Sequence, residues 1–233
     1  MRREYMFGYV LFDLDGTLTD PKIGITSSVQ YALRAFGIEE PDLDQLEPFI
    51  GPPLVDSFME FYGFTREQAF LAVEKYRERF DYQGIYENEM YPGIDVMLSK
   101  LKESKKQLAI ASSKPTPLVI RVLEHFHIKE YFDYIVGSEL DGRRGKKEEV
   151  VEEALRLMAP KMLDAQEKKA CVAMVGDRKF DVEGAKAHGL TSIGVSFGYA
   201  PEGELEAAGA DYIVDTVSQL EAVLMRGVCG DDE

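Results

Sequence analysis

The sequence predicts an α/β fold, in which a Rossmann-like parallel sheet core carries an inserted all-helical segment. From about residue 93 onward, short apolar runs alternate with helical patterns, which is typical of a parallel sheet covered by helices. Residues 7–12 form an almost unbroken apolar run, which indicates a first strand buried on both faces. The next strand pattern begins near residue 107, although a parallel crossover needs only about a dozen residues. This long interval predicts an insertion.

Each element of the core follows from a local pattern. Apolar runs predict strands over residues 7–12, 107–112, 134–136, 170–175, 191–195 and 212–214. Amphipathic patterns predict helices over residues 93–103, 146–158 and 217–225. A further helix is expected to begin with Thr116 as its N-cap and Pro117 at its first position. Another is expected to end near His188, where Gly189 suits the position just after a helix.

The interval after the first strand carries helical patterns of its own. Residues 25–36 have an apolar stripe, and Thr65-Arg-Glu-Gln68 is a capping box that opens a helix through Phe80. Residues 20–21 and 91–93 contain the prolines expected at two hinges. We therefore predict that residues 1–18 and 91–233 form the core and residues 19–90 an inserted helical cap. A lid in this position can exclude water and select substrates.

Composition limits the partners and the cellular setting. The chain has 233 residues, and 27 Lys and Arg against 42 Asp and Glu give a net charge of −15. Such a surface repels polyanions, so we expect no nucleic acid partner and no binding to anionic membranes. The two cysteines, Cys171 and Cys229, make no disulfide framework, and no stretch suits a signal peptide or a membrane span. These features predict a cytoplasmic protein.

Polar side chains follow three of the predicted strands at the point where each strand ends. They are Asp13 and Asp15, then Ser112, Ser113 and Lys114, then Asp177 and Asp181. The carboxyl ends of parallel strands share one edge, where ligands of α/β folds bind. Buried carboxylates repel one another unless a divalent cation shares them or one keeps its proton. Carboxylates, a hydroxyl and a lysine at one edge suit phosphoryl transfer, and Mg²⁺ prefers such oxygen ligands.

Four short segments resemble, in order, the four motifs of the haloacid dehalogenase superfamily, in its phosphoglycolate-phosphatase-like branch with a helical cap. They are Asp13-Leu-Asp-Gly-Thr17, Ile110-Ala-Ser112, a lysine near position 147, and Gly176-Asp-Arg-Lys-Phe-Asp181. The resemblance extends over the chain to about residue 225. One acidic pair is a weak signal, whereas four motifs in order at suitable spacing are a specific one.

The resemblance implies a role for each matched residue. Asp13 is the expected nucleophile, which forms an aspartyl-phosphate, and Asp15 the acid that protonates the leaving alcohol and later activates water. Ser112 and the third-motif lysine are expected to hold phosphoryl oxygens. The implied Mg²⁺ ligands are Asp13, Asp15 through its backbone carbonyl, Asp177, and Asp181 either directly or through a water.

Two assignments stay open at this point. The third-motif lysine often precedes a proline, but here Lys146-Lys147 precedes a glutamate; we favour Lys147, with Lys146 as the alternative. Ser113 is either a substrate contact or a plain loop residue, and Lys114 either a loop residue or one that faces the cap.

The cap loop Ile50-Gly51-Pro52-Pro53 resembles the loop that faces the active site in this branch. Gly51 and Pro52 are therefore candidate substrate-binding residues, because a stiff turn can present backbone groups to a ligand. The same residues also suit a simple turn between helices.

The expected function is a Mg²⁺-dependent phosphatase that hydrolyses a small phosphomonoester of the phosphoglycolate, nucleotide or sugar phosphate type. The acid at Asp15 argues against the namesake dehalogenases and the phosphonatases, which lack it. A phosphomutase of the β-phosphoglucomutase kind shares all four motifs. Outside enzymes, a phosphoryl receiver or an inactive scaffold would share part of the pattern. The expected partner is a small phosphate ester, and the expected state a monomer or homodimer.

Overall fold

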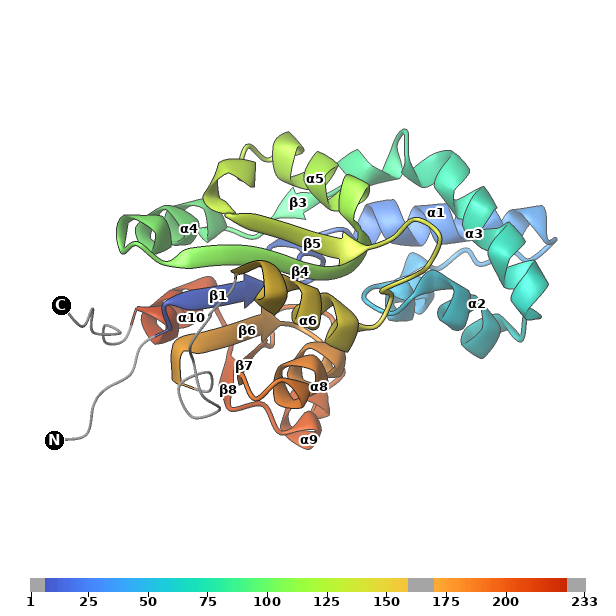
Figure 1. The fold of residues 1–233 in the computed structure, drawn as a ribbon. Coiled ribbons are helices and arrows are strands. Elements are labelled where there is room, and N and C mark those ends of the chain that lie inside the picture. The colour runs from blue at the N-terminus through green and yellow to red at the C-terminus, as the bar shows by residue number, and fades with distance from the viewer. Residues whose placement is uncertain (1–6, 159–169, 226–233) are drawn as a thin grey trace, which may run out of the picture.

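A parallel sheet forms the centre of the structure, a computed structural model that describes residues 7–158 and 170–225 (Figure 1). In the described chain the sheet has six strands in the order β5-β4-β1-β6-β7-β8, and every neighbouring pair is parallel. The strands are β1 (Tyr9–Phe12), β4 (Gln107–Pro115), β5 (Tyr134–Ser138), β6 (Val172–Gly176), β7 (Thr191–Val195) and β8 (Tyr212–Val214). The predicted Rossmann-like α/β fold is confirmed, with β1 between β4 and β6.

Helices cover both faces of this sheet (Figure 1). They are α4 (Ile94–Glu103), α5 (Thr116–His125), η3 (Lys129–Tyr131), α6 (Lys147–Met158), α8 (Lys179–Ala187), α9 (Glu204–Ala208) and α10 (Val217–Leu224). The helix α9 and the short 3₁₀ helix η3 have no counterpart in the sequence prediction, because five and three residues are too few to show a period.

Alternation along β1 explains the two faces. Val10 and Phe12 are fully buried in a core that includes residues of α4, α5 and α10. Leu11 points to the other face, where it packs with residues of α6 and α8. Successive strand side chains point to opposite faces, so a run that is apolar throughout is buried on both. The sheet therefore places the end of β1 in the interior of the molecule.

Several predicted boundaries shift. The strand predicted from residue 170 begins at Val172, and β4 runs on to Pro115. Thr116 was expected as an N-cap, but α5 begins at Thr116 itself with Pro115 in the cap position. The Thr116 hydroxyl instead accepts a hydrogen bond of 3.0 Å from the Gly137 backbone N–H, so it joins α5 to β5 rather than capping the helix.

A helical segment lies between two short strands that leave the core. It comprises α1 (Lys22–Ala35), η1 (Leu43–Phe49), α2 (Leu54–Tyr62), α3 (Arg66–Phe80) and η2 (Gly84–Tyr86). The strands β2 (Thr19–Asp20) and β3 (Glu89–Met90) pair antiparallel and close it. In Figure 1 its helices lie beyond the carboxyl ends of the sheet strands. Its treatment as a separate cap domain over residues 19–90 stays a prediction.

Local sequence also explains the ends of the segment. The predicted capping box is present: Gln68 N–H donates to the Thr65 hydroxyl at 3.2 Å, and Thr65 N–H donates to the Gln68 side chain at 2.9 Å. At the far end of α3, Arg79 donates two hydrogen bonds of 2.7 and 2.9 Å to the Glu87 carboxylate. This bidentate pair ties α3 to the return of the chain into the core.

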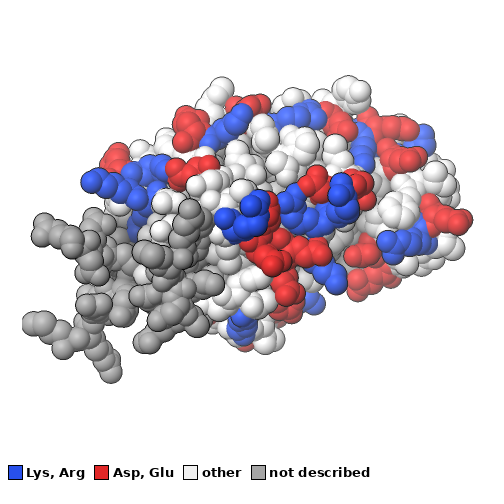
Figure 2. Space-filling view, viewed as in Figure 1, with Lys and Arg blue, Asp and Glu red and all other residues white. Residues whose placement is uncertain are grey.

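The surface carries both signs of charge. On the face in Figure 2, lysines and arginines are interspersed with acidic side chains. Arg143 and Arg144, which stand in the basic run before α6, pair with Asp141 and Glu139. Within the described ranges, no helix has the length and apolar character needed to cross a membrane.

Candidate active site

The turn after β1 places Asp13 and Asp15 at the carboxyl edge of the sheet. Asp13 N–H donates to the Val175 carbonyl at 2.9 Å, which continues the pairing of β1 with β6. The Asp13 Oδ1 accepts from Leu14 N–H at 2.8 Å, which fixes the carboxylate beside the turn. Gly16 has a φ of +80°, a conformation that favours glycine and reverses the chain toward Thr19. Both aspartates are buried, at 5% and 8% exposure.

Three aspartates from different elements form a buried acidic cluster. Carboxylate oxygens of Asp13, Asp177 and Asp181 lie within 4.8 Å of one another. Burial raises the pKa of Asp177 well above its usual value, and the charges of Asp181 and Asp13 raise it further. Burial also raises the pKa of Asp181 to about 6, although Lys147 opposes this. Both shifts express the same fact: these carboxylates lack full compensation of their charge.

Charge balance shows that this cluster suits a divalent cation. Lys147 Nζ lies 2.9 Å from Asp13 and 2.8 Å from Asp181, so one ammonium faces three carboxylates. Asp177 accepts hydrogen bonds from Thr17, at 3.5 Å, and from Tyr199 N–H, at 2.8 Å, but these groups are neutral. The uncompensated charge is that of a divalent ion, and all the donors are the oxygens that Mg²⁺ prefers.

Glycines let the backbone close tightly around the cluster. A Cβ on Gly176 would lie 2.0 Å from the Asp181 carboxyl carbon, and one on Gly16 would lie 2.1 Å from an Asp177 oxygen. A Cβ on Gly198 would lie 2.3 Å from the Asp177 Cβ. Any side chain at these positions would therefore displace a carboxylate of the cluster.

The structure distinguishes the two candidate lysines by position. Lys147 begins α6, is 6% exposed, and donates to the Ala111 carbonyl at 3.0 Å as well as pairing with the aspartates. Burial alone would lower the pKa of Lys147, but the adjacent Asp13 and Asp181 carboxylates raise it overall. Lys147 thus stays a cation at neutral pH. Lys146 is exposed and lies outside the cluster.

Asp15 points away from the acidic cluster and pairs with Lys114. The two Asp15 oxygens lie 2.5 and 2.8 Å from Lys114 Nζ, and both side chains are largely buried. Lys114 Nζ also lies 5.0 Å from the centre of the Phe80 ring of α3. The sequence offered no signal for the Asp15–Lys114 pair, because its members are 99 residues apart. Lys114 lies within β4 and faces Phe80 of the helical segment, so the alternative of a plain loop residue is wrong.

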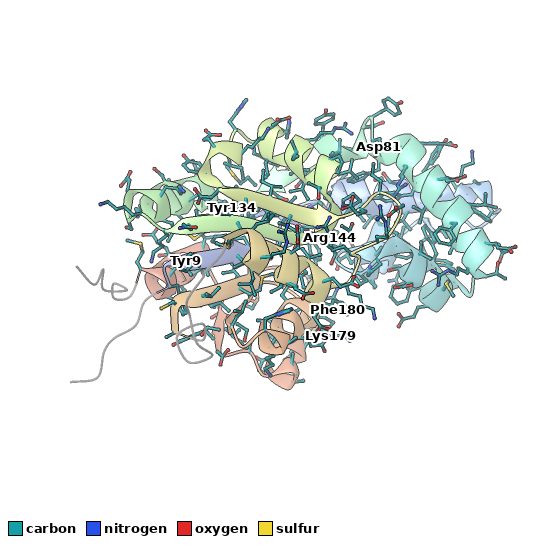
Figure 3. All side chains as sticks on the ribbon, viewed as in Figure 1. Tyr9, Asp81, Tyr134, Arg144, Lys179 and Phe180 are labelled. Atoms are coloured by element: carbon teal, nitrogen blue, oxygen red, sulfur yellow. The ribbon has the colours of Figure 1, made fainter. Side chains whose placement is uncertain are left out.

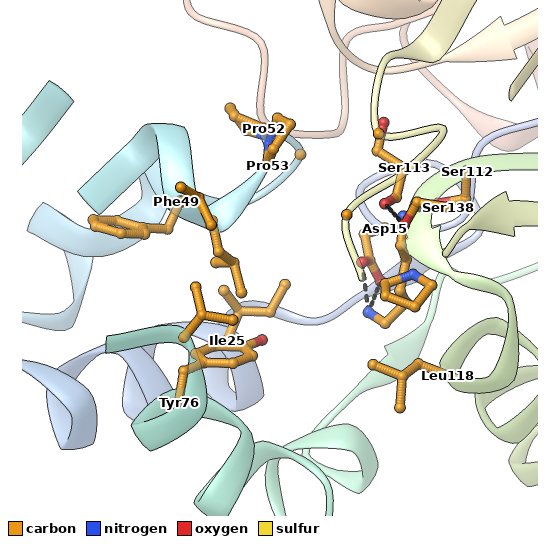
Figure 4. Close-up of a pocket in the computed structure, with 18 of the residues that line it drawn as sticks. Asp15, Ile25, Phe49, Pro52, Pro53, Tyr76, Ser112, Ser113, Leu118 and Ser138 are labelled. Carbon is orange, nitrogen blue, oxygen red and sulfur yellow. Dashed lines mark hydrogen bonds and ion pairs between the residues drawn. The ribbon is translucent and has the colours of Figure 1, made fainter. Parts of the chain in front are cut away.

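A pocket of about 170 Å³ lies between this edge and the helical segment (Figure 4). Asp13, Asp15, Ser112 and Ser113 line the core side, and Ser138 stands beside them. The predicted Gly51 and Pro52 line the opposite side together with Pro53. Aromatic and aliphatic residues of the helical segment complete the lining. The sequence analysis assigned none of them to a pocket, because nothing local distinguishes Phe49, Tyr76 or Phe80 from core residues.

Arg178 connects the acidic cluster to the loop over residues 50–53. It follows Asp177 directly, and its Nη1 donates to the Ile50 carbonyl at 2.9 Å. The same guanidinium is held by Glu204, whose carboxylate lies 2.8 Å from Arg178 Nε. Figure 3 shows the neighbouring Lys179 and Phe180 at the start of α8. The loop therefore has a direct anchor in the segment that carries Asp177.

Together, the fold and the site define an α/β enzyme with a buried acidic cluster at the sheet edge, beside a pocket that Asp13 lines. The chain belongs to the haloacid dehalogenase-like hydrolase family, whose model matches residues 10–195.

Individual relatives are also similar over most of the chain. A protein named 5′-nucleotidase from Pseudomonas aeruginosa is 45% identical over 215 residues, which cover 92% of this chain and 94% of that protein. The tyrosine-protein kinase PtkA of Mycobacterium tuberculosis is 38% identical over 191 residues, covering 82% of this chain and 62% of that protein. The crystal structure of a predicted phosphatase from Clostridium acetobutylicum matches with a TM-score of 0.87 at 46% identity, covering 93% of this chain and 97% of that one.

Proposed function

We propose that this enzyme is a Mg²⁺-dependent phosphatase that hydrolyses a small phosphomonoester through an aspartyl-phosphate on Asp13. One observation carries the proposal: three buried carboxylates face a single lysine, and one of them, Asp13, lines the pocket. The net charge that remains on this cluster is one that a divalent cation would balance. The names of the relatives, a 5′-nucleotidase and a predicted phosphatase, support a phosphate ester as the substrate.

In the first half of the proposed reaction, an Asp13 oxygen attacks phosphorus and the bond from phosphorus to the leaving oxygen breaks. Asp13 Oδ1 contacts Lys147 and accepts a hydrogen bond from Leu14 N–H, so the other oxygen is the one available for attack. Ser112, which lines the pocket, and Lys147, which contacts Asp13, are proposed to bind phosphoryl oxygens. Asp15 gives its proton to the leaving alcohol. In the reacting complex Asp15 is therefore protonated and no longer forms its ion pair with Lys114.

In the second half, water attacks the phosphorus of the aspartyl-phosphate. Asp15 accepts the proton of that water, and the bond between phosphorus and the Asp13 oxygen breaks. Inorganic phosphate leaves, Asp13 is again a carboxylate, and Asp15 holds the proton for the next turnover. Hydrolysis thus proceeds in two displacements in the same pocket, with Asp13 as the first nucleophile and water as the second.

The residues proposed to hold Mg²⁺ are Asp13, Asp177 and Asp181, with the backbone carbonyl of Asp15. When bound, the ion supplies a positive charge that offsets the negative charge of the phosphoryl group. The fit rests on the charge balance of the acidic cluster and on the glycines that close around Asp177 and Asp181.

Residues 19–90 are proposed to act as the cap of this site. They supply Gly51 and Pro52 to the pocket, and both termini of the segment join the core at the paired strands β2 and β3. A cap that closes the pocket keeps bulk water from the phosphoryl group until the alcohol has left. The enzyme is proposed to work in the cytoplasm on a small-molecule ester, as a monomer or homodimer.

The proposal is tested by phosphate release from a panel of phosphomonoesters, with Mg²⁺ and with EDTA. We expect Mg²⁺-dependent release that Asp13→Asn lowers by at least about a thousandfold, because the nucleophile is lost. Asp95→Asn is the matched control, since Asp95 is exposed at the start of α4. Release that persists in EDTA or in Asp13→Asn would overturn the proposal, and isomerisation of a sugar phosphate without release would replace it by a mutase.

A further inference from the structure

The Arg178 side chain is buried between the sheet edge and the helical segment, where arginine is rare unless its charge is paired. It is 9% exposed. Its Nη1 donates to the Ile50 carbonyl at 2.9 Å, which lies in the helical segment. Its Nε and Nη2 donate to the two oxygens of Glu204 in the core, at 2.8 and 3.3 Å. One guanidinium therefore joins the core to the loop over residues 50–53.

Glu204 fixes the direction in which this guanidinium points. Two parallel hydrogen bonds to one carboxylate orient the plane of a guanidinium. The same carboxylate accepts from the Lys179 backbone N–H at 3.0 Å, so it is itself tied to the start of α8. With Nε and Nη2 held in this way, Nη1 is the nitrogen left for the Ile50 carbonyl. A lysine has a single ammonium on a flexible stem and cannot make both connections with the same geometry.

The backbone of Arg178, in contrast, belongs to the acidic cluster. Arg178 follows Asp177 directly, and its N–H donates to Asp181 Oδ2 at 3.1 Å. A substitution of the side chain leaves this hydrogen bond and the cluster carboxylates in place. Arg178 is also not among the described residues that line the pocket. Its side chain can therefore act on a bound ester only through the loop that it holds.

That loop forms one wall of the pocket. Gly51, Pro52 and Pro53 all line it, and in Figure 4 the two prolines stand across the pocket from Ser113. Gly51 has a φ of +105°, and a Cβ at this position would lie 3.3 Å from Arg178 Cγ. The loop backbone thus packs directly against the arginine stem. The position of this wall relative to the sheet edge depends on a contact from the core.

We infer that Arg178 is a positioning residue for the leaving group: it holds the loop over residues 50–53 at a fixed distance from the phosphate-binding edge. The phosphoryl group is proposed to bind on the core side, through Ser112 and Lys147, so its binding does not depend on this arginine. The rest of the ester lies toward the loop, so its binding does. The inference rests on the proposed phosphatase function and gives a role to a residue between the two motif aspartates.

The test compares Arg178→Met with Lys179→Met, which makes the same change of charge at the next, exposed position. For p-nitrophenyl phosphate we expect Arg178→Met to raise KM by at least about fivefold, because the wall is no longer held by a charged donor. The kcat should fall by less than about threefold, because Asp13, Asp15 and Lys147 remain. The inhibition constant of inorganic phosphate, which has no leaving group, should stay within about twofold of the wild-type value. Lys179→Met should change none of these constants.

Two further variants guard against an effect of misfolding. Arg178→Met leaves the largely buried Glu204 without its cation, so the double variant Arg178→Met/Glu204→Gln removes both charges and should show the same rise in KM. Arg178→Lys keeps the charge but not the fork, and it should not restore the wild-type KM. The Mg²⁺-induced rise in Tm should persist in all three variants, because the cluster carboxylates are retained.

Three results would overturn the inference while leaving the phosphatase in place. They are an unchanged KM for the ester, an inhibition constant of inorganic phosphate that rises in parallel with KM, and loss of the Mg²⁺-induced rise in Tm. The last two would place the effect of Arg178 at the phosphate-binding edge or in the acidic cluster rather than in the loop. If the wild-type enzyme releases no phosphate, or Asp13→Asn releases it as fast, the proposed function falls and the inference falls with it.

Discussion

Replacement of Asp181 by asparagine removes one of the three buried carboxylates that face the proposed cation. Burial raises the pKa of Asp181 to about 6, against an ordinary value of 3.8. At about 1.36 kcal/mol per pKa unit, this difference corresponds to about 3 kcal/mol, which the ionised carboxylate costs the folded protein in the absence of metal. Asparagine has nearly the same shape, and its side-chain oxygen can still accept the 3.1 Å hydrogen bond from Arg178 N–H. Its amide NH₂ then takes the place of the Oδ1 that lies 2.8 Å from Lys147 Nζ, so about 3 kcal/mol is the upper limit of the gain.

The direction in which the stability changes with pH follows from proton binding. Between pH 3.8 and about 6 the folded protein holds the Asp181 proton more tightly than the unfolded chain does. The metal-free wild-type protein therefore loses stability as the pH rises through this window, and above about pH 6 the whole cost is present. Asp181→Asn avoids that cost, so we expect it to be more stable than the wild type by up to about 3 kcal/mol near pH 8. For a chain of this length, this is a rise of about 6 to 12 °C in Tm.

Thermal unfolding followed by circular dichroism, at about pH 4.5 and about pH 8 in EDTA, measures this difference. The gain should shrink toward the lower pH, where the wild-type carboxylate takes up its proton. Added Mg²⁺ should raise the Tm of the wild type and raise that of Asp181→Asn less, because a ligand is lost. Glu183→Gln makes the same change of charge at an exposed position of α8 and should change neither value. A lower Tm for metal-free Asp181→Asn than for the wild type near pH 8 would refute the reasoning.

Three further predictions concern single contacts. Lys147→Met should lower kcat by at least about a hundredfold, because it removes the buried cation beside the nucleophile. The exposed Lys146→Met should keep near wild-type activity, and equal losses would contradict Lys147 as the phosphate-binding lysine. Glu87→Gln should lower the free energy of unfolding by about 1 to 2 kcal/mol at neutral pH in urea titrations. Its pKa is lowered from 4.5, chiefly by hydrogen bonds from Arg79, so the difference should disappear as the pH falls below 4.5, and a constant difference would point to packing instead. Gly198→Ala should abolish the Mg²⁺-induced rise in Tm, because the added Cβ would lie 2.3 Å from both the Gly16 carbonyl oxygen and the Asp177 Cβ. An undiminished rise would show that the backbone moves to accommodate the methyl group.

The sheet could be predicted from sequence because its signals are local. An apolar run such as residues 9–12 must be buried on both faces, and a polar residue that follows it must lie at the sheet edge. For this reason Asp13, Ser112 and Asp177 could be placed at one edge without coordinates. The helix α2 is amphipathic but short, since its nine residues make only about two and a half turns, and the prolines directly before it suit a simple turn; it was therefore missed. The 3₁₀ helix η1 contains Pro48, which argues locally against a helix.

The contacts within the pocket were less predictable, because each joins residues far apart in the chain. Lys114 was noted as a residue after a strand, but its pairing with Asp15 depends on the extension of β4 to Pro115 and on the shift in its register against β5 between Ala111 and Pro115. Tyr76 lies in a predicted helix and Phe49 in one that the sequence did not predict; both are buried, and nothing local distinguishes them from ordinary core residues. Only the approach of the helical segment to the sheet edge turns one side of each ring toward the pocket. Motifs identify reacting groups, whereas the substrate-facing half of the pocket depends on tertiary packing.

The segment after β6 shows how the two halves of the site are joined. Asp177 contributes to the acidic cluster, and the next residue, Arg178, holds the loop over residues 50–53 through the Ile50 carbonyl. Tyr199 makes a second connection, since its backbone N–H donates to Asp177 while its hydroxyl hydrogen-bonds Asp20 at the start of the helical segment. The second link begins at the Asp177 carboxylate and the first at the residue that follows it. The sequence Gly-Asp-Arg therefore specifies a cluster aspartate and also fixes where the helical segment stands over it, so a substitution at position 178 would alter substrate binding without touching a reacting atom.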